Sequence, residues 1–309
     1  MPTSPSRADR ARGVIVGLAC GDALGAPVEF ESRQTIAAKY PRGLRDFTSG
    51  GWMDVVPGEL TDDSRMMMDL AETLVRPGPV DLVHLGQRFV AWMNENPKDI
   101  GVTTRIAIEA LRDGVHWSES GELALRQRGP NGAASNGSVM RCAPVAVRFA
   151  GNPDQLREVS IDTTRITHSE PRCTWAAVAL NQAIAHALGG GDIRGLTVAA
   201  TAGIDQVDVV RVITNAPDRQ EGDLNGKGYV LNAVEIAFWA TMTQPTFEDA
   251  VVSAVMIGDD TDTNAAVTGA LAGAVHGYAA IPERWRTTVH QHDRLVGLAD
   301  QLLAAGSAG

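Results

Sequence analysis

The 309-residue sequence is poor in cysteine and lacks the cysteine spacings that are typical of zinc sites. Its three cysteines, Cys20, Cys142 and Cys173, stand far apart in unlike surroundings. An odd and sparse set of cysteines predicts buried thiols in a reducing compartment rather than a disulfide framework. A disulfide-stapled secreted domain and a cysteine-ligated zinc protein are therefore both excluded as interpretations.

Positive charge is also in short supply. The chain has 27 Lys and Arg residues against 37 Asp and Glu residues, which gives a formal net charge of −10. This balance argues against nucleic acid or an anionic membrane as the main partner. We expect a monomer, in which any basic pocket for an anionic ligand is confined to a small area.

Long apolar runs of the kind that cross membranes or direct secretion are missing as well. The apolar stretch after the polar N-terminal residues is interrupted by Asp22, whereas a signal peptide has a longer apolar core that ends in a small-residue cleavage site. Residues 264–281 are nearly uncharged, but their Asn, Thr, His, Gly and Ala residues make them only weakly hydrophobic. We therefore expect a cytoplasmic protein without a membrane span, in which residues 264–281 form a buried core helix.

Alternating strand patterns are scarce. The best strand candidate is "APVAVRFAG", residues 143–151, and its tail fits a buried helix equally well. Helical periodicity dominates instead, and residues 64–75 place Met67, Leu70 and Leu74 on one face. Four more stretches behave in the same way, namely residues 83–93, 101–114, 171–191 and 228–242. Because no linker or low-complexity tract divides the chain, we predict one all-α domain of about a dozen helices.

What the sequence does contain, in two places, is a stripe of glycines at four-residue spacing. The two stripes are Gly17, Gly21 and Gly25, and Gly269, Gly273 and Gly277. Glycine inside a helix reduces its stability by roughly 1 kcal/mol relative to alanine. A regular stripe of glycines therefore indicates that close packing offsets this loss. We therefore expect two helices whose backbones approach closely, with the two stripes facing each other at the centre of the fold.

Two short acidic clusters are the other unusual feature. They contain seven oxygen-bearing side chains, which are Thr61, Asp62 and Asp63 in "LTDDS" and Asp259, Asp260, Asp262 and Thr263 in "GDDTDT". Each cluster stands at a predicted helix start, where capping by one Thr or Asp is a sufficient explanation for that cluster alone. Together the clusters exceed what capping requires. Carboxylates and hydroxyls without His or Cys suit Mg²⁺, Mn²⁺ or Ca²⁺, and two clusters could bracket a pair of ions roughly 4 Å apart.

Six motifs in this order resemble the ADP-ribosylglycohydrolase family. They are "GLACGDALGAPVEF", "LTDDSRM", "NGSVMRCAPVAV", "THSEPRC", "GYVLNAVEIAFWA" and "GDDTDTNAAVTGALAGAVHG". The resemblance implies one all-α domain over residues 1–309, with its core at about residues 14–285, around a dinuclear site for two Mg²⁺ or Mn²⁺ ions. It further implies a metal-dependent hydrolase that acts on ADP-ribosylated protein and releases ADP-ribose.

The resemblance also implies metal ligands and catalytic residues. The implied metal ligands are Thr61, Asp62, Asp63, Asp260, Asp262 and Thr263. Asp259 stands where family members often have Gly, so it is expected beside the ions rather than on them. Glu29 completes the family motif "GDALGAPVE" and is implied as the general base. A metal-bridging aspartate such as Asp62 or Asp262 is the alternative.

Substrate contacts are implied in three further places. The loop expected beside the terminal ribose and the pyrophosphate of ADP-ribose consists of Asn136, Gly137, Ser138, Val139 and Met140. The resemblance implies that His168 orients this loop or the ribose, and that Tyr229 stacks on adenine. Without the resemblance, these features would be a turn-rich loop, a structural histidine and a core aromatic at a helix start.

The bond that is cleaved is expected to be the N-glycosidic link to arginine, because the overall likeness points to the bacterial branch of the family. Two other interpretations remain open. One is a two-metal phosphohydrolase that acts on a nucleotide. The other is a relative that binds ADP-ribose without catalysis.

Overall fold

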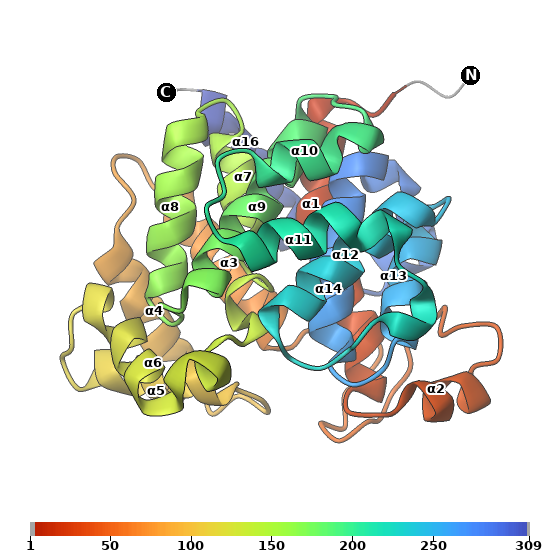
Figure 1. Cartoon of the computed structure of the whole chain (residues 1–309), viewed down its shortest axis with the longest axis horizontal. Helices are drawn as coiled ribbons and strands as arrows, with labels where there is room; N and C mark the ends of the chain where they lie inside the picture. The colour runs from red at the N-terminus through yellow and green to blue at the C-terminus, as the bar shows by residue number, and fades with distance from the viewer. Residues whose placement is uncertain (1–3, 308–309) are drawn as a thin grey trace.

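Helices account for nearly all of the regular structure. A computed structural model of the chain describes residues 4–307, in which sixteen α-helices pack around a main hydrophobic core (Figure 1). Their bounds are α1 Arg7–Gly25, α2 Arg33–Lys39, α3 Asp62–Leu74, α4 Leu82–Asn94, α5 Val102–Arg112, α6 Trp117–Ala133, α7 Ala143–Phe149, α8 Pro153–Arg165, α9 Pro171–Leu188, α10 Leu196–Thr201, α11 Val207–Asn215, α12 Val230–Thr243, α13 Phe247–Met256, α14 Thr261–His276, α15 Glu283–Arg286 and α16 His292–Ser307. Two short 3-10 helices, η1 (Ala26–Val28) and η2 (Asn136–Ser138), help to form the site described below. The predicted all-α fold is confirmed.

The centre of the fold is the pair formed by α1 and α14, which come from opposite ends of the chain (Figure 1). Their backbones touch where the glycine stripes meet. A Cβ atom added to Gly17 would lie 2.4 Å from the carbonyl oxygen of Gly269, and one added to Gly269 would lie 2.1 Å from that of Gly17. The predicted contact between the stripes is therefore confirmed at Gly17 and Gly269. Elsewhere the register differs from the prediction: Gly13 faces Gly273, Gly21 faces Ala265, and Gly25 faces Thr261 and Asp262. Gly277 ends α14 with a φ of 81°.

Helix α1, continued through η1, is the one segment within residues 4–307 whose length and composition would allow it to cross a membrane. In this fold 94% of its apolar window is buried inside the protein. Residues 264–281 fall mostly in α14, whose side chains are also buried, so the predicted core helix is confirmed. Packing inside the protein thus explains both apolar segments.

The best strand candidate, residues 143–151, is wrong, because residues 143–149 form α7 instead. Pro144 in the first turn starts this helix, and burial on nearly every side removes the periodicity that would have identified it. Within residues 4–307 there is no strand, and extended pairing amounts to three isolated bridges: Ser32 with Gly258, Gly50 with Val55, and Ser135 with Tyr229. The structure also has more helices than expected, since short ones such as α2, α10 and α15 show too few residues for a period.

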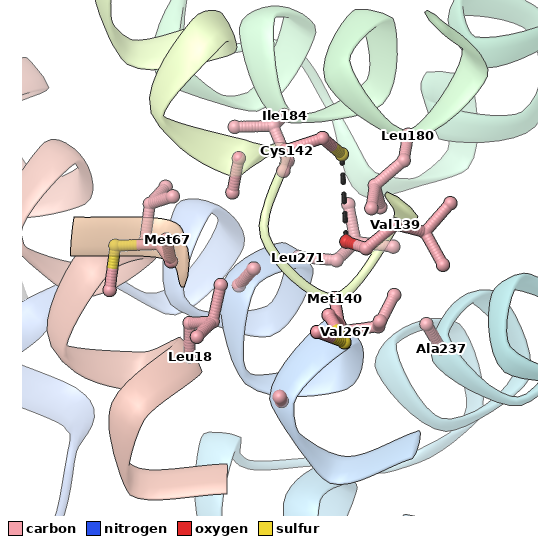
Figure 2. Close-up of a cluster of buried hydrophobic side chains, with 14 of the residues drawn as sticks. Leu18, Met67, Val139, Met140, Cys142, Leu180, Ile184, Ala237, Val267 and Leu271 are labelled. Atoms are coloured by element: carbon pink, nitrogen blue, oxygen red, sulfur yellow. Dashed lines mark hydrogen bonds between the residues drawn. The ribbon is translucent and has the colours of Figure 1, made fainter. Parts of the chain in front are cut away.

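The main core continues directly beneath the loop at residues 136–140. Figure 2 shows Val139 and Met140 among buried side chains that include Leu180 of α9 and Leu271 of α14. The thiol of Cys142 donates a hydrogen bond to the carbonyl oxygen of Val139 at 3.5 Å (Figure 2). All three cysteines are buried and free, as expected, and burial raises the pKa of the Cys142 thiol to about 12. The three thiols therefore act as packing groups, and that of Cys142 supports the loop.

Candidate active site

The two acidic clusters lie at helix starts that meet in the fold. Thr61 is the N-cap residue of α3, and Asp260 is that of α14. Neither of these side chains caps its own helix, so capping does not explain the clusters. The hydroxyl of Thr263 donates to Oδ2 of Asp63 at 3.4 Å, across 200 residues of sequence. The two clusters therefore form one site.

The start of α3 is capped from another helix, by Asp22 of α1. The buried carboxylate of Asp22 accepts hydrogen bonds from the backbone N–H groups of Thr61 and Ser64, at 3.1 and 3.2 Å. It also accepts from both hydroxyls, that of Thr61 at 2.8 Å. Burial raises the pKa of Asp22 to about 6, although these hydrogen bonds oppose the rise. Nothing in the motif that contains Asp22 indicated this role, which fixes the first acidic cluster relative to α1.

Glu29 brings a third segment to the acidic site. It directly follows η1, and one oxygen atom from each of Glu29, Asp260 and Asp262 lies within 4.8 Å of the others. The indole N–H of Trp52 donates to Oε2 of Glu29 at 2.6 Å. Burial raises the pKa of Glu29 to about 8; the Trp52 hydrogen bond opposes this rise, and the negative charge of Asp260 adds to it. In the absence of a cation, Glu29 is therefore protonated more readily than an exposed glutamate.

The carboxylates of this site are crowded enough to favour the binding of a cation. Burial raises the pKa of Asp62, Asp63 and Asp262 well above the usual range, and repulsion from neighbouring carboxylates adds to the rise. Oδ1 of Asp63 is buried and has no hydrogen-bond partner within residues 4–307. Such a group is costly unless something positive binds it. All of the donors are oxygen atoms, which fits hard divalent cations such as Mg²⁺ and Mn²⁺.

A cavity of about 300 Å³ is lined by these carboxylates. Glu29 lines it together with five of the six predicted metal ligands, which are Asp62, Asp63, Asp260, Asp262 and Thr263. Thr61 lies outside this lining, and its hydroxyl donates to Asp22. Asp259 also lies outside, and its φ of 61° is the left-handed backbone that favours glycine at this position.

The predicted substrate loop contributes only part of its length to the cavity. The three residues that line it are Asn136, Gly137 and Met140. Ser138 and Val139 do not line the cavity. The turn of η2 points successive side chains in different directions, and the side chain of Val139 enters the hydrophobic core. The side-chain amide of Asn136 donates to Oδ2 of Asp260 at 3.1 Å. This hydrogen bond ties the loop to the second acidic cluster.

A buried arginine supports the loop from the core side. The guanidinium of Arg141 donates to the carbonyl oxygen of Gly137, and also to Oγ1 of Thr167 at 2.7 Å. Because a trans peptide group is planar, the first of these contacts directs the N–H of Ser138 away from Arg141. A backbone N–H presented in this way suits an anionic group such as a phosphate.

His168, predicted at the site, lies behind the same loop. Its ring nitrogens are each 2.8 Å from a hydroxyl, that of Ser135 on one side and that of Thr167 on the other. The side chain is fully buried, and burial, assisted by the charge of Arg141, lowers the pKa of His168 to about 3. A neutral imidazole with both nitrogens occupied, outside the cavity lining, is suited to orient the loop.

Tyr229, predicted to stack on adenine, lies at the start of α12 beside the loop. It pairs with Ser135 through an isolated bridge, and its neighbour Gly228 lines the cavity. The hydroxyl of Tyr229 accepts a hydrogen bond from Arg172 at 3.0 Å, and the guanidinium carbon of Arg172 lies 5.5 Å from the ring centroid. Tyr229 is not itself among the residues that line the cavity, so stacking on adenine stays a prediction.

Two charged residues that line the cavity were not recognised in the sequence. Asp99 lies shortly before α5, and its carboxylate accepts from the N–H of Ile100 at 2.7 Å. Arg128 lies at a kink in α6, where Gly129 has a φ of 68°. It is the only Lys or Arg residue in the cavity lining within residues 4–307. Neither residue belongs to a motif, and single charged residues of this kind are common on any surface.

Removal of divalent cations is expected to make the stability of the protein fall as pH rises. Asp22, with a pKa of about 6, and Glu29, with a pKa of about 8, titrate above the ordinary values of roughly 3.9 and 4.3. The folded state then binds more protons than the unfolded state, so the free energy of unfolding decreases between about pH 5 and about pH 8. Urea denaturation in EDTA measures this slope, and saturating Mg²⁺ is expected to flatten it. A metal-free protein that gained stability over this range would contradict the expectation.

The chain is similar to known proteins over nearly its whole length. Residues 3–308 match the model of the family described as ADP-ribosylglycohydrolase. The chain is 33% identical over 287 residues to the ADP-ribosyl-[dinitrogen reductase] glycohydrolase of Rhodospirillum rubrum, with 92% of this chain and 91% of that protein covered. It is 32% identical over 309 residues to the ADP-ribosylarginine hydrolase Tri1 of Serratia proteamaculans, with 95% and 79% covered.

A solved structure described as an ADP-ribosylglycohydrolase-related protein complex has the same fold. Its TM-score against this chain is 0.83, at 30% sequence identity. The match covers 97% of this chain and 99% of that chain. Likeness in sequence and in structure therefore extends over nearly the whole length, and the chain belongs to the ADP-ribosylglycohydrolase family.

Proposed function

We propose that this protein is a metal-dependent hydrolase that cleaves the glycosidic bond between ADP-ribose and an arginine side chain of a protein, and releases free ADP-ribose. The observation that carries the proposal is the meeting of two acidic helix starts and Glu29 at one cavity. Membership of the family supplies the reaction class. We further propose that the protein acts in the cytoplasm as a monomer, on protein rather than nucleic acid.

Two Mg²⁺ or Mn²⁺ ions would be held by the residues of the two helix starts, which are Thr61, Asp62, Asp63, Asp260, Asp262 and Thr263. When bound, these ions supply Lewis-acid polarisation of substrate oxygen atoms and orientation of a water molecule. With the repulsion within the site neutralised, the carboxylates stay ionised at neutral pH.

The carboxylates suit a reaction that builds positive charge on the substrate. Cleavage of a glycosidic bond gives the ribose oxocarbenium character, which nearby anionic groups stabilise. Asp62 and Asp262 are buried and line the cavity, where they are placed to provide this stabilisation. Glu29 is proposed to take the proton from the attacking water, because it lines the cavity and lies within 4.8 Å of carboxylate oxygens of Asp260 and Asp262. Asp62 or Asp262, which would hold the ions, is the alternative proton acceptor.

The cavity also offers contacts for the phosphates of ADP-ribose. Arg128 supplies the local positive charge that an acidic protein needs for an anionic ligand. The loop at residues 136–140, which lines the cavity through Asn136, Gly137 and Met140, is proposed to lie beside the pyrophosphate. Adenine is proposed to lie at the edge of the cavity, where Tyr229 adjoins the lining residue Gly228.

The linkage proposal predicts that an Arg-linked ADP-ribosyl peptide releases ADP-ribose at least about tenfold faster than a matched Ser-linked peptide. A protonated guanidinium leaving group is attracted by the carboxylates of the cavity, whereas a serine hydroxyl is not. Chromatography of free ADP-ribose measures the release, with EDTA as the control. Faster release from the Ser-linked peptide would overturn the arginine assignment and keep the hydrolase. Release of phosphate would indicate a nucleotide phosphohydrolase, and binding without release would indicate a non-catalytic relative.

Substitution of Tyr229 by Ala is expected to weaken ADP-ribose binding by roughly 1–3 kcal/mol, the range of base–aromatic stacking. Tyr229→Phe is the matched control, because it keeps the ring and removes only the hydroxyl that accepts from Arg172. Its affinity is expected to change little. Calorimetric titration with ADP-ribose measures both variants, and unchanged affinity in Tyr229→Ala would assign the ring to packing against Arg172.

A further inference from the structure

One aromatic side chain touches the proposed general base directly. Trp52 donates its indole N–H to Oε2 of Glu29 at 2.6 Å, while its own side chain is 50% exposed. Glu29 is only 6% exposed. Trp52 therefore stands at the boundary between the buried carboxylate and solvent, and it is the only side chain within residues 4–307 that donates a hydrogen bond to that carboxylate.

The turn that carries Trp52 is itself fixed in place. Gly50 and Val55 pair through two backbone hydrogen bonds of 2.9 Å each. Met53 and Val55 pack with Ala26 of η1 in a small apolar cluster that is separate from the main core. Glu29 directly follows η1, so the same small cluster supports both the turn that carries Trp52 and the segment that carries Glu29.

The residue that follows Glu29 is held just as firmly. The N–H of Phe30 donates to the carbonyl oxygen of Asp259 at 2.6 Å, and the N–H of Asp259 donates to that of Glu31 at 2.9 Å. Phe30 and Asp259 have φ values of 64° and 61°, which are uncommon for residues other than glycine. Such backbone persists only where its surroundings hold it, and it clusters at functional sites. The ring of Phe30 packs against that of Trp52, with 5.5 Å between centroids.

We propose that Trp52 is a positioning residue that holds the Glu29 carboxylate at the acidic site, through its N–H on Oε2 and its ring on Phe30. A free glutamate side chain loses much rotamer freedom when it is held in one place, and the hydrogen bond offsets that cost. The carboxylate so held lies within 4.8 Å of ligand oxygens of Asp260 and Asp262. The inference rests on the proposed function, in which Glu29 handles a proton next to the ions.

The test is a double-mutant cycle built from Trp52→Phe and Glu29→Gln. Trp52→Phe keeps an aromatic ring beside Phe30 and removes the N–H donor. It is expected to lower kcat on the Arg-linked peptide about tenfold with little change in KM, and to weaken Mn²⁺ binding several-fold, as partners of metal-site groups do. In the Glu29→Gln background, the same substitution is expected to change Mn²⁺ affinity by less than about twofold, because the group through which it acts is already altered.

Mn²⁺ affinity is measured by titration of the metal-free protein and needs no turnover. It therefore tests Trp52 independently of the reaction, whereas a wild-type protein that releases no ADP-ribose counts against the proposed function alone. Trp117→Phe is the control, since it removes a partly buried tryptophan of α6 outside the cavity lining and is expected to change neither kcat nor Mn²⁺ affinity. Additive losses in the double variant would overturn the proposal, as would a Trp52→Phe protein with wild-type kcat and Mn²⁺ affinity.

Discussion

Replacement of Asp262 by Asn is expected to abolish ADP-ribose release and to remove most of the stabilisation that Mg²⁺ or Mn²⁺ gives to the wild-type protein. Asp262 is buried in the first turn of α14 and lines the cavity. One of its carboxylate oxygens lies within 4.8 Å of those of Glu29 and Asp260. Asn keeps the shape of the side chain and an oxygen that can accept from the N–H of Thr263, but it removes the negative charge that hard cations prefer.

In the absence of metal the same substitution is expected to have the opposite effect on stability. Burial, together with repulsion from Glu29 and Asp63, raises the pKa of Asp262 well above its usual range. Its ionised form is therefore unfavourable without a cation, and metal-free Asp262→Asn is expected to be at least as stable as the metal-free wild type at neutral pH. Mg²⁺ at about 100 times its dissociation constant is expected to stabilise the wild type by roughly 2.7 kcal/mol, and the variant by much less.

Thermal melts and ADP-ribose release, each measured with EDTA and with Mg²⁺, examine both expectations. Asp259→Asn is the matched control, because it makes the same chemical change in the same cluster outside the cavity lining. The φ of 61° at this position is one that Asn adopts readily. This variant is expected to keep most of the activity and the full response to metal. Release of ADP-ribose at the wild-type rate by metal-free protein, or by Asp262→Asn, would contradict the hypothesis that the reaction depends on bound divalent cations.

Substitution of Gly17 by Ala is expected to destabilise the protein by about 3 kcal/mol or more, although it adds a single methyl group. The added Cβ atom would lie 2.4 Å from the carbonyl oxygen of Gly269 and 3.2 Å from its carbonyl carbon. Both are backbone atoms, so the clash is relieved only if α1 and α14 move apart. In an unhindered helix the same change has the opposite sign, because alanine is favoured over glycine by roughly 1 kcal/mol.

Gly297→Ala in α16 provides the unhindered control. A Cβ atom there would meet only Nε2 of Gln301, at 3.8 Å. This variant is expected to gain up to about 1 kcal/mol, and urea denaturation measures both proteins. Because α1 carries Asp22 and α14 carries Asp262, Gly17→Ala is also expected to weaken Mg²⁺ binding. Equal stability of the two variants would mean that the central contact tolerates a methyl group, contrary to the structure.

The order of amino acids by itself determined the helical elements and the ligand chemistry. Apolar residues at helical spacing predicted α3, α4, α5, α9 and α12 within a few residues, because that period depends only on neighbouring positions. The glycine stripes predicted the contact between α1 and α14. Glycine destabilises a helix, and close packing of two backbones offsets that loss of stability. The two acidic clusters predicted a hard-cation site, because the kind of donor atom is a property of the side chain alone.

Tertiary structure alone decided which side chains share the site. Asp22, which lies in α1, caps the start of α3. Trp52 donates a hydrogen bond to Glu29 from a turn that lies elsewhere in the sequence. Arg128 lines the cavity from the kink in α6. Val139 lies in the predicted substrate loop, and yet its side chain belongs to the core. Each of these placements depends on how helices distant in sequence pack against one another. Packing of that kind leaves no period and no fixed spacing in the chain, because one buried contact can be made from many different sequence separations.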